Sequence, residues 1–162
     1  MQQDETLAPC GRAVGCTALS DQLFLGLGAQ LAPGSKVGLD IVQVSRVEES
    51  LANFGTRFES RFFTEGELAY AREGEGQFAE RLAARFAAKE ATIKALSFSN
   101  AGVDWREMEV QRDADGACSM VLHGRALQLA REAGVSHLML SLSHDGDYAG
   151  AVIVAALSDK PG

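Results

Sequence analysis

Alternating large apolar and small or polar residues mark the predicted strands of this chain. The run Val-Gly-Leu-Asp-Ile-Val that follows residue 36 has a period of two, which predicts a strand. Leucines alternate with methionine and serine over 138–143, and after an Asp-Gly-Asp turn a second predicted strand, 148–156, returns along the first. Two further predicted strands, 105–112 and 117–122, flank the hairpin sequence Asp-Ala-Asp-Gly. Strands joined by such tight turns favour antiparallel pairing.

Between the strands the apolar residues repeat with the period of an α-helix. Helices are predicted at 44–53, at 64–73 and at 124–134, the second of them opening with the capping box Thr-Glu-Gly-Glu. The strongest helical pattern runs over 77–96, where seven alanines favour a helix and the large apolar side chains form one stripe. This order predicts a single α+β domain, with a mainly antiparallel sheet packed against the long helix.

The first thirty-five residues differ from the rest in being rich in glycine, proline and cysteine. We expect residues 1–35 to be an N-terminal extension, partly ordered at best, with a short helix over 21–31. The folded domain is expected over 36–158, and residues 159–162 are expected to be a C-terminal tail.

Composition narrows the classes of partner. With 46% hydrophobic residues the chain can bury a sizeable core, and its formal net charge of -7 argues against a general nucleic-acid binder or a polybasic membrane-surface protein. We find no apolar run long enough for a membrane span and no signal peptide. The odd number of cysteines (Cys10, Cys16 and Cys118) favours reduced thiols, so a cytoplasmic protein is expected.

Several common catalytic motifs are absent from the sequence. There is no GxxxxGK[ST] phosphate loop, no GxGxxG after a strand, and no HExxH zinc motif. The tripeptide Ser143-His144-Asp145 is not a hydrolase triad, because neighbouring residues of a strand point to opposite faces.

Asp40 is the first candidate site residue, because aspartate is disfavoured within an apolar strand. A buried carboxylate needs a partner, a proton or a metal. Gly38, two residues earlier on the same face, leaves room for something to approach. The alternative interpretation is a structural aspartate that caps the next helix or pairs with an arginine.

The long helix carries the second group of candidates. Glu90 lies at the edge of its apolar stripe, with Lys94 one turn further on and a row of alanines beside them, where a ligand could come close. Glu90 and Lys94 could equally form an ordinary i,i+4 ion pair. Lys89 projects into the apolar stripe, as a snorkelling lysine would, and Arg85 could be an ordinary solvated charge.

His144 is the third candidate, since it shares the parity of the leucines on the apolar face of its strand. A lone histidine there could also be a hydrogen-bonded structural residue, and Asp145 and Asp147 could simply be turn residues. Taken together, two carboxylates from different elements and a cation are the parts of a magnesium–phosphate site.

At these residues the sequence resembles the holo-acyl-carrier-protein synthases, which are small 4′-phosphopantetheinyl transferases. The likeness lies in four stretches in the family's order, 37–42, 57–67, 85–96 and 140–149, and in a middle segment, 105–124. The block RFAAKEATIKAL is the most specific of them, and its spacing from GLD and SHD strengthens the match. The resemblance implies an enzyme that moves the phosphopantetheine arm of coenzyme A to a serine of an acyl carrier protein and releases 3′,5′-ADP.

The resemblance also implies roles for single residues. Asp40 and Glu90 would hold magnesium with the pyrophosphate of coenzyme A, and Lys94 would contact phosphate. His144 would lie at the phosphate end of the site, while Arg85 and Lys89 would help to hold the nucleotide phosphates. The base that takes the serine proton could be a metal-bound water, Asp40 or His144. Arg46, Arg57 and Arg61 match basic positions that receive the acidic carrier protein in this family.

The family is typically a homotrimer that binds coenzyme A between subunits, and the same is expected here. Two departures from its pattern favour an alternative, a non-catalytic member that only binds coenzyme A or the carrier. Ser97-Phe98-Ser99-Asn100 stands where the family has a glycine-rich turn, and the N-terminal extension is unusual. The resemblance implies a carrier of fatty-acid or polyketide biosynthesis.

Overall fold

The computed structural model describes residues 34–158, so the predicted tail and nearly all of the predicted N-terminal extension, with its helix, lie outside the described residues. The elements in chain order are β1 (Lys36–Gln43), α2 (Val44–Phe54), α3 (Thr56–Phe62), α4 (Glu65–Arg72), α5 (Phe78–Leu96), η1 (Trp105–Glu107), β2 (Met108–Arg112), β3 (Cys118–Leu122), α6 (Gly124–Glu132), β4 (Val135–Asp145) and β5 (Tyr148–Leu157). The predicted α+β class is confirmed.

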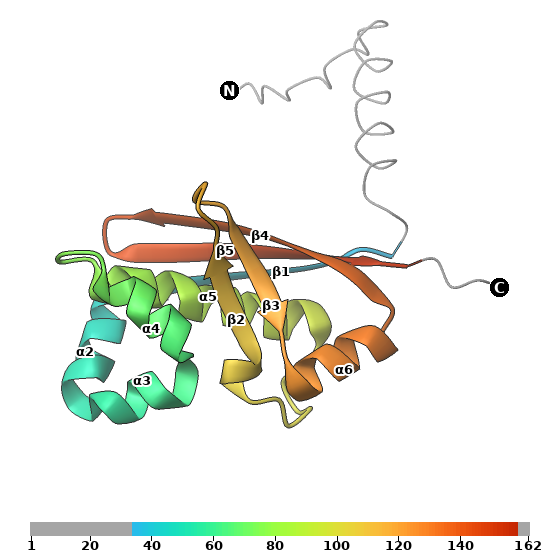
Figure 1. Cartoon of the computed structure of the whole chain (residues 1–162), viewed down its shortest axis with the longest axis horizontal. Helices are drawn as coiled ribbons and strands as arrows, with labels where there is room; N and C mark the ends of the chain where they lie inside the picture. The colour runs from blue at the N-terminus through green and yellow to red at the C-terminus, as the bar shows by residue number, and fades with distance from the viewer. Residues whose placement is uncertain (1–33, 159–162) are drawn as a thin grey trace, which may run out of the picture. The chain divides into compact units, whose positions relative to one another are not determined.

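The main sheet has three antiparallel strands in the order β1-β5-β4, and β2 and β3 form a separate antiparallel pair. Figure 1 shows the three long strands running across α5, with α2, α3 and α4 gathered at one end of that helix and α6 at the other. Asp40 of β1 is aligned with Ala151 of β5, and Ala151 with Leu142 of β4. This row lies on the face of the sheet that covers α5.

Close packing of α5 on β1 depends on small residues. A Cβ atom at Gly38 would lie 1.9 Å from the backbone oxygen of Ala91, a distance that no real side chain could tolerate. The room beside Gly38 is therefore taken by the backbone of α5 and not by a ligand. The alanines expected to leave space for a ligand are core residues instead, since Ala83 and Ala87 are fully buried.

One helix was not predicted. The segment between Gly55 and Phe63, to which no element was assigned from the sequence, forms α3. Gly55 has φ 51° and ends α2, so the chain turns and a new helix begins at once. None of the residues of α3 is fully buried, and its seven residues are too few to show a helical period in the sequence. Its Phe58 and Phe62 rings pack against Phe86 of α5.

The core has two parts, which meet along α5. One joins the C-terminal half of α5 to the sheet, to β2 and β3 and to α6, and the other joins its N-terminal half to α2, α3 and α4. Because α5 contributes to both, it fixes the position of every element that carries a candidate site residue.

The opposite face of β1 is apolar and exposed. Val37, Leu39 and Ile41 are 61%, 55% and 62% exposed. Met139 of β4 is also exposed, and it lies in the row that runs from Val37 across β5. An apolar face of this kind is uncommon on a monomer and typical of an interface. None of the helices in the described part is long and apolar enough to cross a membrane.

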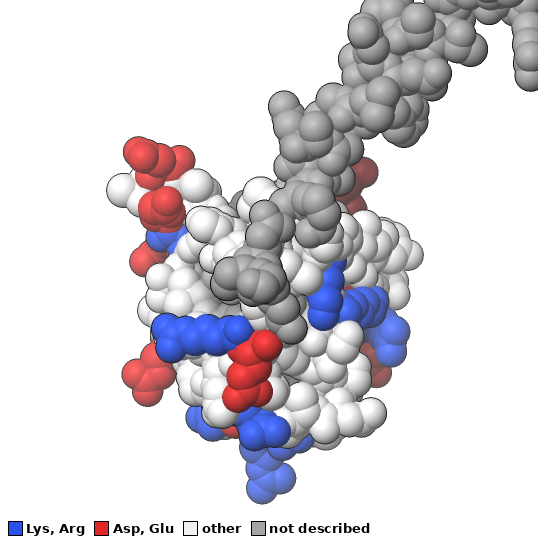
Figure 2. Space-filling model, turned by 90° about the vertical axis from the view of Figure 1, so that its right-hand side faces the viewer, with Lys and Arg blue, Asp and Glu red and all other residues white. Residues whose placement is uncertain are grey.

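The charged side chains do not gather on the side of the domain that carries α6. Figure 2 shows this side, where basic and acidic side chains are interspersed among uncharged ones. On this side the net negative charge therefore forms no acidic patch.

Candidate active site

Asp40 and Lys94 form an ion pair across the contact between β1 and α5. Lys94 Nζ lies 2.7 Å from Asp40 Oδ1 and also donates to the backbone oxygen of Leu39 at 3.1 Å. The hydrogen bond with Asp40 raises the pKa of Lys94, so the ammonium stays charged. Of the two alternatives for Asp40, capping the next helix is wrong, and its cationic partner is this lysine and not an arginine.

Glu90 lies beside this pair without joining it. Burial raises the pKa of the Glu90 carboxyl, the charge of Asp40 raises it further, and Lys94 partly offsets both. The i,i+4 ion pair between Glu90 and Lys94 is not among the ion pairs of the described residues. The two carboxylates thus repel each other, and the one ammonium beside them is paired with Asp40.

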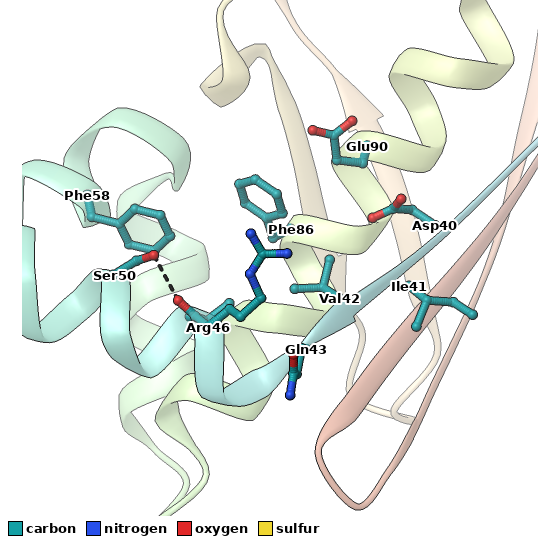
Figure 3. A pocket seen from close by; sticks show the side chains of 10 residues that line it. Asp40, Ile41, Val42, Gln43, Arg46, Ser50, Phe58, Phe86 and Glu90 are labelled. Carbon is teal, nitrogen blue, oxygen red and sulfur yellow. Dashed lines mark hydrogen bonds between the residues drawn. The ribbon is translucent and has the colours of Figure 1, made fainter.

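A cavity of about 340 Å³ opens next to the two carboxylates. Asp40 and Glu90 line it from β1 and α5, while Arg46 and Ser50 line it from α2 and Phe58 from α3 (Figure 3). A cavity with acidic groups, a guanidinium and aromatic walls can take a ligand that carries both charge and apolar surface.

A second hollow, of about 330 Å³, lies against Glu90 as well. It is lined mainly by apolar side chains, and its other lining residues are Ile93, Phe98, Ser99, Gly102, Val103, Trp105 and Met108. Glu90 therefore stands between two cavities.

The segment that departs from the family's glycine-rich turn begins with a residue in the left-handed conformation. Ser97 is the C-cap of α5 and adopts the left-handed conformation, with φ 60° and ψ 41°. Ser97, Ser99 and Asn100 line a hollow with Lys94. The serine thus takes the conformation that a glycine would adopt most easily, and it adds a hydroxyl group beside the lysine.

His144 does not join Asp40, Glu90 and Lys94 within one chain. Its Nδ1 lies 3.5 Å from Glu80 Oε2, near the start of α5. Glu80 and Glu90 are ten residues apart on this helix, which places them about 15 Å from each other along its axis. The described chain therefore brings three of the four expected catalytic residues together.

Arg85 and Lys89 do not reach the cavity either. Arg85 is 3% exposed and lies over the ring of Tyr70, with its guanidinium carbon 4.2 Å from the ring centre. Burial lowers the pKa of Arg85, while the charge of Glu67 raises it. Lys89 is fully buried and pairs with Glu67 at 2.7 Å, so it does not snorkel to solvent. In this structure neither side chain is available to a phosphate.

Glu67 was not identified as the partner of Lys89 from the sequence. The capping box that contains it is confirmed, since Glu67 Oε2 accepts from the backbone N–H of Thr64. The sequence did indicate that such a partner exists, because Lys89 is a charged residue in an apolar stripe and a buried charge requires a partner.

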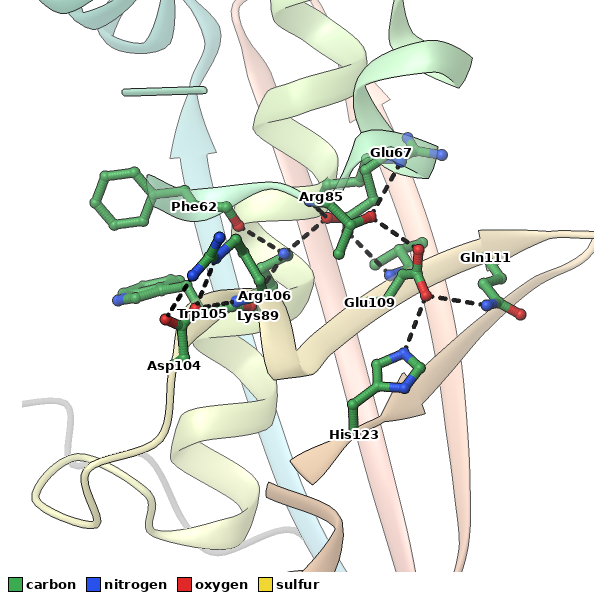
Figure 4. A network of polar contacts seen from close by, with 12 residues as sticks. Phe62, Glu67, Arg85, Lys89, Asp104, Trp105, Arg106, Glu109, Gln111 and His123 are labelled. Carbon is green, nitrogen blue, oxygen red and sulfur yellow. Dashed lines mark hydrogen bonds and ion pairs between the residues drawn. The ribbon is translucent and has the colours of Figure 1, made fainter. Parts of the chain in front are cut away.

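Glu109 and His123 extend the polar contacts around this pair (Figure 4). Burial raises the pKa of Glu109, but hydrogen bonds from Thr64, Gln111 and His123 outweigh that effect and lower it overall. His123 Nε2 thus lies 3.0 Å from the Glu109 carboxylate. These contacts hold β2 against the start of α4.

The three arginines expected to receive a partner lie on α2 and α3. Arg46 lines the cavity beside Asp40, while Arg57 and Arg61 line a groove of about 360 Å³ with Phe54 and Phe62. Phe54 is 62% exposed. The cavity and the groove share Ser50 and Phe58, so they are neighbours on one surface.

The carboxylates of Asp40 and Glu90 fit a magnesium ion. Within residues 34–158 no group of three or more His, Cys, Asp or Glu side chains could hold a metal by itself. Magnesium needs no such group, because it prefers oxygen ligands and usually keeps several waters and substrate phosphates beside one or two carboxylates. The mutual repulsion of the two carboxylates would be relieved by a divalent cation.

Comparison with known proteins supports one family. Residues 36–153 match the model of the 4′-phosphopantetheinyl transferase superfamily. The holo-[acyl-carrier-protein] synthase of Koribacter versatilis is 42% identical over 118 residues, which cover 72% of this chain and 94% of that protein. The corresponding synthase of Moorella thermoacetica is 43% identical over 125 residues, covering 76% of this chain and 94% of that protein.

Solved structures agree in fold. A Chronobacterium ammoniagenes ACPS–coenzyme A complex has a TM-score of 0.69 and 34% identity, and the match covers 78% of this chain and 99% of that one. A Helicobacter pylori holo-[acyl-carrier-protein] synthase in complex with coenzyme A has a TM-score of 0.65 and 26% identity, and the match covers 74% of this chain and 99% of that one. Both structures contain the ligand that the sequence resemblance implied.

Proposed function

The chain belongs to the 4′-phosphopantetheinyl transferase superfamily and is a holo-[acyl-carrier-protein] synthase, and from this premise we propose how its residues carry the reaction. The activity transfers the phosphopantetheine arm of coenzyme A to an acyl carrier protein and belongs to fatty-acid biosynthesis. The acceptor is a serine hydroxyl of the carrier. Its oxygen bonds to the phosphorus that bears the arm, the bond from that phosphorus to the oxygen of 3′,5′-ADP breaks, and the hydroxyl proton passes to a base at the site. The convergence of Asp40 and Glu90 beside Lys94 carries this assignment.

Asp40 and Glu90 are the metal ligands in this proposal. They would hold Mg²⁺ together with the pyrophosphate of coenzyme A. When bound, the ion supplies charge neutralisation at the phosphates and lowers the pKa of coordinated water. The chain itself contributes the placement of both carboxylates on rigid elements, since β1 and α5 are locked together at Gly38.

Lys94 supplies the fixed positive charge. Its ammonium is held by Asp40 and the backbone oxygen of Leu39, and it borders the hollow lined by Ser97, Ser99 and Asn100. It would contact a phosphate of coenzyme A and offset the charge of the departing nucleotide. Arg85 and Lys89 receive no such role here, because both side chains are buried away from this place.

His144 reaches the phosphate end of the site from a neighbouring subunit. Two observations support a homotrimer with coenzyme A bound between subunits: His144 lies far from Glu90 on its own chain, and the apolar outer face of β1 is exposed. A closed ring of three copies would cover that face and bring the histidine of one chain toward the carboxylates of the next.

The groove with Arg57 and Arg61 is the docking surface for the acidic carrier protein. Its basic side chains complement acidic partners, and its aromatic floor offers apolar contact. Arg46 lies between the groove and Asp40, at the place where the serine must enter. The cytoplasm is the expected compartment, because an odd number of cysteines favours reduced thiols; within residues 34–158 Cys118 forms no disulfide.

Mass spectrometry of an apo carrier protein incubated with coenzyme A, Mg²⁺ and this protein tests the proposal. The carrier should gain the mass of one phosphopantetheine arm, and Asp40→Ala or Glu90→Ala should abolish the gain while the circular dichroism spectrum stays that of the wild type. Full activity of either variant would contradict the metal site. No transfer to any of several fatty-acid and polyketide carriers would contradict the function itself.

A further inference from the structure

Lys89 uses all of its hydrogen-bonding capacity inside the protein. Its Nζ lies 2.6 Å from the backbone oxygen of Phe62, 3.1 Å from that of Trp105 and 2.7 Å from Glu67 Oε2. An ammonium group has three N–H donors, and each of them has an acceptor here. The cation therefore acts as a fixed joint between α5, the end of α3 and η1.

The carboxylate of Glu67 is equally occupied. Besides Lys89 it accepts the backbone N–H of Thr64 at 2.9 Å and that of Val110 at 2.9 Å. Both side chains of the pair are 0% exposed. Figure 4 shows the pair within its network of polar contacts. The pair thus adds the start of α4 and the strand β2 to the segments that Lys89 holds.

The two carbonyl groups bound by Lys89 belong to residues whose rings form a wall beneath the site. Trp105 stacks on Phe86 with ring centres 5.0 Å apart, and Phe62 meets Trp105 edge-on at 4.9 Å. Phe86 lines the cavity with Glu90, while Phe62 lines the groove with Arg57. The aromatic wall therefore runs from the metal site to the docking surface.

We propose that Lys89 and Glu67 are positioning residues, which fix the distance between the docking groove on α3 and the carboxylate of Glu90, and so the point at which the carrier serine meets the phosphate. The inference rests on the proposed function of both surfaces. For stability alone an apolar pair of similar size would serve as well, whereas a fully bonded ion pair permits one arrangement only.

Removal of both charges tests this role. In the double variant Glu67→Gln/Lys89→Met neither partner is left as an unpaired buried charge. We expect kcat for carrier modification to fall by about 10-fold to 100-fold, because small misplacements of reacting groups lower rates by such factors. The KM for coenzyme A and the dependence on Mg²⁺ should change less than about twofold, because Asp40, Glu90 and Lys94 remain.

The fluorescence of Trp105 reports directly on the contacts made by Lys89, since Trp105 is the one tryptophan of the chain. Its fluorescence emission should shift in the double variant, because its backbone is no longer held by Lys89. Thr92→Val is the matched control: it removes a buried hydrogen bond within α5, from Thr92 Oγ1 to the oxygen of Ala88, and leaves the ties to α3 in place. This control should keep both kcat and the emission maximum.

If the double variant does not fold, a second variant tests the positioning role. Trp105→Leu keeps both charges and removes only the ring that packs on both Phe62 and Phe86, so it should also lower kcat at unchanged KM for coenzyme A. By contrast Arg57→Glu, in the docking groove, should raise the KM for the carrier.

Failure of the positioning role and failure of the transferase function give different results. A wild-type protein without transfer activity would remove the proposed function and the positioning role with it. An active wild type with unchanged kcat in the folded double variant, or in Trp105→Leu, would show that the pair only stabilises the fold. A selective rise of the KM for coenzyme A in the double variant would mean that Lys89 holds the nucleotide phosphates after all.

Discussion

At the scale of single residues, the negative charge of the Glu90 carboxylate is disfavoured by its surroundings. It is partly buried, it faces Asp40, and the nearby ammonium is already paired with that aspartate. A raised carboxyl pKa means that the deprotonated form opposes folding at pH values above the ordinary pKa of 4.5. In the absence of metal the charged Glu90 therefore lowers the free energy of unfolding, and a bound cation would offset this loss.

Replacement of Glu90 by glutamine should separate stability from metal binding. Without Mg²⁺ at neutral pH, Glu90→Gln should melt at the same temperature as the wild type or a higher one, because the variant has no charge to desolvate. Added Mg²⁺ should raise the melting temperature of the wild type and leave that of the variant unchanged. Differential scanning fluorimetry measures both effects, and a metal response that survives in Glu90→Gln would exclude Glu90 as a ligand.

At the scale of elements, the ends of two helices decide where the site residues stand. Asp147, interpreted from the sequence as a turn residue, accepts hydrogen bonds from the backbone N–H and the hydroxyl of Ser45 and from Gln43 Nε2. It therefore caps the start of α2, the helix that carries Arg46. At the end of α5, Ser97 holds the left-handed turn next to Lys94.

The cap on α2 should make stability depend on acid pH. The bonds from Gln43 and Ser45 lower the pKa of Asp147 below its ordinary value of 3.8. Its contribution is complete above pH 3.8 and is lost as the pH falls through the lowered pKa. Asp147→Asn should thus unfold at lower urea concentration than the wild type at neutral pH, with the difference shrinking in strong acid.

The matched control for this variant is Asp145→Asn, which removes the same charge from the same hairpin turn. It should change the urea midpoint less than Asp147→Asn does. Equal effects of the two substitutions at neutral pH would show that charge, and not the cap, is responsible.

Replacement of Ser97 by glycine should stabilise the protein. A side chain in the left-handed conformation is strained, and glycine removes that strain while losing more backbone freedom on folding. We expect a net gain of about 0.5–1 kcal/mol in the free energy of unfolding. Denaturant titration measures it, with Ser99→Gly, at a residue of negative φ, as the control that should gain nothing. A loss of stability in Ser97→Gly would contradict this account of the turn.

At the scale of the whole molecule, the period of the apolar residues predicted the α+β architecture, the long helix and the hairpins, because these features are local in the sequence. It did not predict α3, which is short and follows a glycine turn. The pairing of Asp40 with Lys94 and of Lys89 with Glu67 was not predictable either, since both pairs join different elements. The motif order identified the candidate residues of the site, but only the tertiary structure shows that His144 lies away from Asp40, Glu90 and Lys94 of its own chain.

The exposed face of β1 leads to a prediction about assembly. Leu39→Glu places a charge in the middle of this face, and Leu39 keeps its backbone contact with Lys94. Light scattering after gel filtration should show a trimer for the wild type and a monomer for the variant, with carrier modification lost as well.

Ser119→Glu, which adds the same charge at an exposed position of β3, should leave assembly and activity unchanged. A wild type that elutes as a monomer, or a trimeric Leu39→Glu variant, would contradict the proposed interface.

The separation of His144, which contacts Glu80, from Glu90 ten residues further along α5 has a genetic consequence. If each site draws its carboxylates from one subunit and its histidine from the next, Asp40→Ala and His144→Ala damage different copies of the chain. Two such inactive proteins, unfolded together and refolded as mixed assemblies, would form some intact sites, and activity would reappear. The same complementation would be seen in a cell that expresses both alleles, whereas two alleles that both lack Asp40 or Glu90 would never rescue each other.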